Sequence, residues 1–122
     1  MIITCDFDHT LKFETGEVNQ QTLDLLSAFD AQVIIISTRK NTDVNLQEIV
    51  DFILQNNISV VGIHLVGDEH QKLAKAIEVG STLHFDDSEE ALQLFDNNGI
   101  LTVNCFDKEV WETHLKNLEI DL

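Results

Sequence analysis

The stretch MIITCDFDHT (residues 1–10) joins an apolar run to two aspartates, Asp6 and Asp8, that are two positions apart. The near-continuous apolar run is typical of a β-strand that is covered on both faces, as the strands of a parallel sheet are. Side chains two positions apart on a strand point to the same side. Burial of a carboxylate is unfavourable unless a partner compensates for it, so the end of this strand needs such a partner.

Outward from this stretch, the chain alternates between two kinds of segment. Four further runs rich in aliphatic and β-branched residues predict strands over 32–38, 59–66, 81–87 and 99–105. Helical spacing of apolar residues predicts helices over 19–29, 43–57, 68–80, 88–99 and 107–118. This alternation indicates right-handed crossovers and a doubly wound parallel sheet. We therefore expect one α/β domain over residues 1–122, a Rossmann-like three-layer α/β/α sandwich with a five-stranded parallel sheet.

The composition disfavours several classes of function. Asp and Glu number 22 against 7 Lys and Arg, a formal net charge of −15, which disfavours nucleic acid as a partner. No apolar run approaches the roughly 20 residues that a membrane span needs. The start of the chain has no signal-peptide pattern, and the two cysteines, Cys5 and Cys105, have no ligand-like spacing. We therefore expect a cytoplasmic protein without a membrane anchor.

Polar side chains follow three of the predicted strands, and ligands of such sheets bind beyond the carboxyl ends of the strands. The side chains that follow the strands are Asp6, Asp8, Ser37, Thr38, Asp86 and Asp87. Lys72, near the start of a predicted helix, joins them. Two carboxylates about 4 Å apart repel by about 4 kcal/mol at an effective dielectric constant of 20, so several gathered carboxylates need a cation. An oxygen-only ligand set favours a hard ion such as Mg²⁺.

The side chains at this carboxyl edge of the sheet can catalyse phosphoryl transfer. One aspartate can attack an electrophilic phosphorus and form an aspartyl-phosphate, and a second carboxylate can serve as general acid and then as general base. A hydroxyl and an ammonium group can hold the phosphoryl oxygens while the cation offsets the developing charge.

The order of these motifs resembles that of the haloacid dehalogenase superfamily of phosphatases. The first motif of that family, D-x-D-x-T, corresponds to residues 6–10, and the second, an apolar strand that ends in Ser or Thr, corresponds to VIIIS ending at Ser37. Its lysine at a helix start corresponds to Lys72, with Lys75 as the alternative, and its final acidic pair lies in LHFDD, residues 83–87. The resemblance covers nearly the whole chain and implies the strand order 5-4-1-2-3. His9 departs from it, because the family usually has a small or turn-forming residue there.

The resemblance also implies a role for each motif residue. Asp6 would be the nucleophile and Asp8 the general acid and base. Ser37 and Lys72 would hold the phosphoryl group, with Thr38 able to replace Ser37. Mg²⁺ would bind the Asp6 carboxylate, the main-chain oxygen of Asp8 and one acid of the Asp86–Asp87 pair. We favour Asp87 as the direct ligand and Asp86 as the partner of Lys72, and the reverse assignment stays open.

Members of this family often carry a cap domain, for which this chain has no room. The segment 11–20 is too short for one, and residues 39–71 are used by one helix and one strand. An open site suits a macromolecular substrate or a small substrate enclosed by a neighbouring subunit. The acidic charge favours the small substrate or, as the alternative, a phosphoprotein surface. We therefore expect a small phosphorylated metabolite or nucleotide as substrate, and a homo-oligomer would cover the open site. Arg39 and Lys40 either attract this substrate or shield the acids.

Other functions fit the sequence less well. A response-regulator receiver domain would need its phosphoacceptor at the end of the third strand, where only Asp68 could serve. A metal-dependent nuclease would need a basic groove that this composition does not supply. A non-catalytic module that binds phosphate or metal is the main alternative, and a polynucleotide or protein phosphatase is less favoured. Asp87 has a structural alternative as the N-cap of the next helix, a position that Ser88 could take instead.

Overall fold

The computed structural model describes residues 1–104, so Cys105 and the helix expected over 107–118 lie outside the described residues. Five strands and four helices alternate along the described chain. The strands are β1 (Ile2–Cys5), β2 (Gln32–Ser37), β3 (Gly62–Leu65), β4 (Leu83–Asp86) and β5 (Leu101–Asn104). The helices are α1 (Gln20–Ser27), α2 (Asp43–Gln55), α3 (Glu69–Val79) and α4 (Glu89–Asp96).

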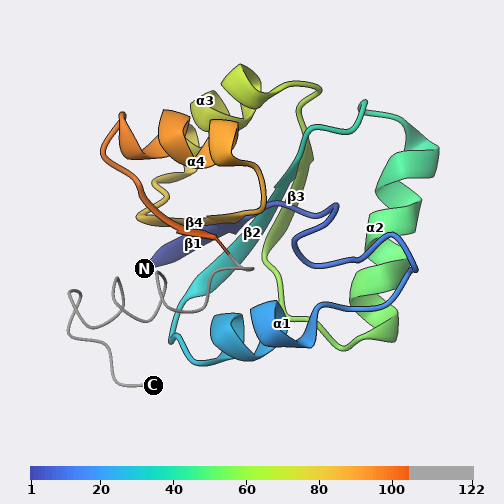
Figure 1. Cartoon of the computed structure of the whole chain (residues 1–122). Coiled ribbons are helices and arrows are strands. Elements are labelled where there is room, and N and C mark those ends of the chain that lie inside the picture. The colour runs from blue at the N-terminus through green and yellow to red at the C-terminus, as the bar shows by residue number, and fades with distance from the viewer. Residues whose placement is uncertain (105–122) are drawn as a thin grey trace.

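The strands form one parallel sheet in the order β3-β2-β1-β4-β5 (Figure 1). This confirms the α/β class, the parallel sheet and the strand order expected above. The order of strands reverses next to β1, the point at which doubly wound sheets open a crevice for ligands. Cys5 of β1 lies opposite Ile35 of β2 and Phe85 of β4, so the ends of these three strands meet at one edge.

Both faces of the sheet are covered, as the apolar runs predict. Val33 and Ile35 of β2 belong to the core that α1 and α2 cover. Ile34 and Ile36 of the same strand belong to a second core with residues of α3 and α4. This alternation along one strand is the geometric reason that its whole sequence is apolar.

Each helix begins at a side chain that accepts a hydrogen bond from the backbone of the first turn. The capping residues are Asn19, Thr42, Asp68 and Ser88. Because Ser88 caps α4, Asp87 is not needed as a cap. Gly80 ends α3 in the left-handed conformation, with φ of 79°, as expected for a C-cap glycine.

The first strand is shorter than its apolar run, because the chain turns sharply after it. The carbonyl oxygen of Phe7 accepts hydrogen bonds from the N–H groups of Leu11 (3.0 Å) and Lys12 (3.2 Å). His9 takes a left-handed conformation in this turn, with φ of 64°. The turn directs residues 6–10 across the carboxyl edge of the sheet instead of continuing the strand.

No helix among residues 1–104 is long and apolar enough to span a bilayer.

Candidate active site

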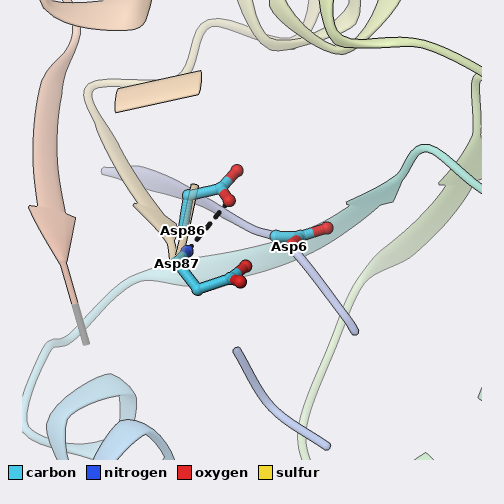
Figure 2. Close-up of side chains that lie close together, drawn as sticks. All are labelled: Asp6, Asp86 and Asp87. Atoms are coloured by element: carbon cyan, nitrogen blue, oxygen red, sulfur yellow. Dashed lines mark hydrogen bonds between the residues drawn. The ribbon is translucent and has the colours of Figure 1, made fainter. Parts of the chain in front are cut away.

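Three aspartates meet at the ends of the neighbouring strands β1 and β4. Asp6, Asp86 and Asp87 each offer one carboxylate oxygen, and these three atoms lie within 4.8 Å of one another (Figure 2). The backbone N–H of Asp6 donates to the carbonyl of Phe85 over 2.9 Å, which fixes Asp6 beside the acidic pair. Asp6 is 7% exposed and Asp86 is fully buried. The structure therefore brings together one acid of the first motif and both acids of the last.

The hydroxyl of Thr10 joins the two sides of this cluster. Its Oγ1 donates to Oδ1 of Asp87 over 3.1 Å and lies 3.5 Å from Oδ2 of Asp6. Thr10 reaches this place because the turn after β1 folds back over the edge of the sheet. The threonine of the D-x-D-x-T pattern thus orients the carboxylate of Asp87.

Lys72 is the lysine of the site, and its side chain is 1% exposed. Its Nζ lies 3.0 Å from Oδ2 of Asp86 and 3.3 Å from Oδ1 of Asp6. Lys75, the alternative, pairs with Glu78 instead and is partly exposed. Burial alone would lower the pKa of Lys72, but the charges of Asp6 and Asp86 outweigh it and raise the pKa above its ordinary value, so the ammonium stays charged.

The environment separates the pKa values of the two buried carboxyls. Burial, together with the charge of Asp86, raises the pKa of Asp6 well above its ordinary value despite the nearby ammonium of Lys72. Burial acts in the same direction on Asp86, but the hydrogen bonds from His84 and Lys72 and the charge of Lys72 outweigh it and lower its pKa. Asp86 is therefore ionised and is the counter-ion of Lys72. The nearby positive charge is not enough to favour the ionised form of Asp6.

The side chain of Asp8 lies apart from the three-aspartate cluster and pairs with Arg39. Arg39 donates from Nε to Oδ2 and from Nη2 to Oδ1 of Asp8, each over 2.8 Å. Its Nη1 donates to Glu48 of α2 over 2.6 Å, and the guanidinium lies over the ring of Phe7. The hydrogen bonds from Arg39 lower the pKa of Asp8. Arg39 was expected either to attract the substrate or to shield the acids. In the structure it neutralises Asp8, an acid of the first motif.

The hydroxyls of the second motif lie at the same edge. Ser37 ends β2 next to β1, is 1% exposed, and accepts a hydrogen bond from the N–H of Arg39 over 3.1 Å. Thr38 is the next residue and is half-buried. The buried position of Ser37 at the strand end makes it the better placed of the two hydroxyls.

Two residues near the cluster are absent from the sequence prediction. Nε2 of His84 lies 2.8 Å from Oδ2 of Asp86, and Oε2 of Glu69 lies 3.2 Å from Nζ of Lys72. His84 is two positions before Asp86 on β4, and Glu69 is three positions before Lys72 on α3. Strand alternation and helical spacing are thus the signals that could have found them.

The cluster fits a hard cation. Its ligand atoms are all carboxylate oxygens, and they converge although only one buried lysine faces them among residues 1–104. The raised pKa of Asp6 shows that its charge is under-compensated, and a cation would supply the missing charge. Asp6 and Asp87 are the residues best placed to hold it, since Lys72 already neutralises Asp86.

No family model matches the chain, and neither does any curated protein. The chain is similar in structure to a chain of the Pnkp1/Rnl/Hen1 RNA repair complex, with a TM-score of 0.69 and 16% sequence identity. The likeness covers 84% of this chain and 41% of that one, so the chain spans less than half the length of its structural neighbour. At this identity, the likeness supports the fold alone.

Proposed function

We propose that this chain is a phosphomonoester hydrolase of the haloacid dehalogenase type, which uses Mg²⁺ and forms an aspartyl-phosphate on Asp6. One observation carries the proposal: Asp6, Asp86 and Asp87 converge at the ends of two adjacent parallel strands, beside the buried Lys72. The resemblance of the motifs to that family supports the same conclusion.

In the first step, an oxygen of Asp6 attacks the phosphorus and the bond from phosphorus to the leaving oxygen breaks. Lys72 and the hydroxyl of Ser37 hold the phosphoryl oxygens. The hydrogen bond that Ser37 accepts from Arg39 leaves its own O–H to donate. Protonated Asp8 gives its proton to the leaving oxygen.

In the second step, Asp8 takes a proton from a water molecule, which attacks the phosphorus. The bond between the phosphorus and Asp6 then breaks, inorganic phosphate leaves, and Asp8 is again protonated. Because Arg39 favours the ionised form of Asp8, it supports this second step and opposes the proton donation of the first. Substrates whose leaving group needs little protonation should therefore react fastest.

Asp6 and Asp87 would hold the Mg²⁺, with Asp86 retained as the partner of Lys72. When bound, the cation would supply positive charge that keeps Asp6 ionised and offsets the charge on the phosphoryl oxygens. Thr10 keeps the carboxylate of Asp87 turned toward Asp6.

The substrate that we propose is a small phosphorylated metabolite or nucleotide, in the cytoplasm. The net charge of −15 disfavours a polynucleotide. The structural neighbour belongs to an RNA repair complex, so a phosphorylated RNA is the second substrate to test.

The experiment compares hydrolysis of an aryl phosphate by the wild-type chain and by Asp6→Asn, with and without Mg²⁺. Asp30→Asn is the matched control, because it removes the same charge from an exposed aspartate before β2, at the opposite edge of the sheet. We expect Mg²⁺-dependent turnover in the wild type and the control, and a loss of more than about a thousandfold in Asp6→Asn. No turnover with any divalent cation would favour a non-catalytic module.

A further inference from the structure

His84 is a buried histidine that the proposed catalytic steps leave without a role. It is fully buried, its Nε2 lies 2.8 Å from Oδ2 of Asp86, and its ring stacks on Phe95 of α4 with the centroids 3.9 Å apart. His84 and Asp86 are two positions apart on β4, so their side chains share the face of the sheet that α3 and α4 cover. The contact therefore follows directly from the strand geometry.

Both carboxylate oxygens of Asp86 are occupied. Oδ1 accepts from the backbone N–H groups of Asp87 (2.9 Å, Figure 2) and Ser88 (3.1 Å). Oδ2 accepts from Nζ of Lys72 (3.0 Å) and faces Nε2 of His84 (2.8 Å). A carboxylate has about four acceptor positions, so Asp86 has none left for a cation.

Asp87 differs in this respect. Its Oδ1 accepts from Thr10 over 3.1 Å, and its Oδ2 accepts no hydrogen bond from residues 1–104. Of the two adjacent acids, Asp87 is thus the one with oxygen lone pairs available, and Thr10 turns it toward Asp6.

The neighbours of the imidazole decide which of its nitrogens carries the proton. Nε2 faces a carboxylate, which only accepts hydrogen bonds when ionised, so the proton of the neutral ring belongs on Nε2. Nδ1 lies 2.8 Å from Oγ1 of Thr4 on β1, which can donate to it. Thr4 in turn lies 2.7 Å from Oγ of Ser81. The ring is thereby held from both sides, with its donor aimed at Asp86.

We infer that His84 is a positioning residue that fixes which acid of the pair binds the cation. By occupying Oδ2 of Asp86, it holds this carboxylate as the partner of Lys72 and leaves Asp87 as the cation ligand. This inference rests on the proposed function, because it concerns the cation of the same site. Loss of the Nε2 donor would free an acceptor position on Asp86, and Asp86 could then replace Asp87 in part.

The test measures Mn²⁺ binding to the full chain by electron paramagnetic resonance, with Mn²⁺ as a spectroscopic substitute for Mg²⁺. Asp87→Asn is made in the wild-type background, in His84→Leu, which removes the donor, and in His84→Gln, whose amide nitrogen can replace Nε2. We expect Asp87→Asn to weaken binding about tenfold or more in the wild-type and His84→Gln backgrounds, and less than about threefold in His84→Leu. If His84→Leu does not fold, His84→Met replaces it, because methionine has no hydrogen-bond donor either.

A second readout needs neither a variant nor a metal. The ¹⁵N shifts of the imidazole in the wild-type chain show which tautomer is present, and we expect the proton on Nε2. A proton on Nδ1 would overturn this inference. So would an equal loss of Mn²⁺ affinity from Asp87→Asn in all three backgrounds, provided that the wild type binds Mn²⁺. Neither result would contradict the proposed function. If the wild type binds no divalent cation, both the proposed function and this inference are wrong.

Discussion

Arg39 holds both carboxylate oxygens of Asp8, with Nε and Nη2 each 2.8 Å from their acceptors. The pairing brings an arginine from the segment after β2 onto the acid that we propose as proton donor and acceptor. Glu48 and the ring of Phe7 hold the guanidinium in this place. Arg39 therefore controls how readily Asp8 gains or loses a proton.

Replacement of Arg39 by Met should raise the pKa of Asp8, because the hydrogen bonds from Arg39 are the main cause that lowers it. A carboxyl group whose pKa is lower in the folded state stabilises the fold at pH values above its unfolded-state pKa, which is about 3.9 for Asp. This stabilisation is lost as the pH falls through the folded-state pKa. Wild type should therefore be more stable than Arg39→Met at neutral pH, and the difference should close in acid. Carboxyl ¹³C titration and urea unfolding measure the two effects, and an unchanged Asp8 pKa would contradict the pairing.

The same pairing predicts a dependence on the leaving group. Wild type should hydrolyse aryl phosphates with acidic phenols faster than alkyl phosphates, because ionised Asp8 is a poor proton donor. Rates measured across a series of leaving groups test this. Equal rates across the series would show that proton donation does not limit the reaction.

Replacement of Lys72 by Met should destabilise the fold strongly, because it leaves Asp6 and Asp86 buried without their ammonium partner. Removal of one partner of a buried ion pair costs about 3–5 kcal/mol. Lys75→Met is the matched control, on the same helix with a partly exposed pair, and should change the free energy of unfolding little. Urea unfolding measures both variants, and similar losses in the two would mean that Lys72 is not the buried cation of the site.

Replacement of His9 by Gly should leave the fold equally stable or more stable, because His9 has a left-handed backbone with φ of 64°. Non-glycine residues pay roughly 1 kcal/mol or more for this conformation, and a β-branched residue is worse. His9→Val should therefore be less stable than His9→Gly by about 1–2 kcal/mol. Thermal unfolding of the pair checks this, and a more stable valine variant would contradict the conformation of this turn.

Asp6→Asn should be more stable than the wild type when no metal is present, since burial and the charge of Asp86 raise the pKa of Asp6. With a raised folded-state pKa, ionisation of Asp6 weakens folding as the pH rises through that value, so the advantage of the variant should grow with pH. Added Mg²⁺ should stabilise the wild type and leave Asp6→Asn unchanged. Thermal unfolding at several pH values tests this, with Asp30→Asn as control. Equal stabilisation of both chains by Mg²⁺ would place the cation elsewhere.

The sequence predicts the sheet well because its determinants are local. Apolar runs such as VIII (33–36) need cover on both faces, and this requirement specifies a parallel sheet. The strand order came from the family resemblance and is confirmed. The start of β2 at Gln32 is confirmed, and the predicted end at residue 105 lies outside the described residues. The other predicted strand ends extend one to three residues too far, and at β1 the reason is the turn that begins at Phe7.

The site is only partly predictable for a different reason. The positions of Asp6, Asp86 and Asp87 follow from where strands end, and Lys72 from where a helix begins. The Arg39–Asp8 pair and the His84–Asp86 contact depend on which side chains meet after folding, and the composition of the motifs alone does not specify this. Side-chain partners are the part of the site that the sequence leaves undetermined.

The most direct test of Asp6 as nucleophile is to identify the phosphorylated residue during turnover. The wild-type chain, mixed with an aryl phosphate and Mg²⁺, is quenched in acid after a fraction of one turnover, digested and mapped by mass spectrometry. We expect a phosphoryl group on Asp6, absent from Asp6→Asn and present in Asp30→Asn. Phosphorylation of a different residue, or steady hydrolysis that survives Asp6→Asn, would contradict the proposed nucleophile.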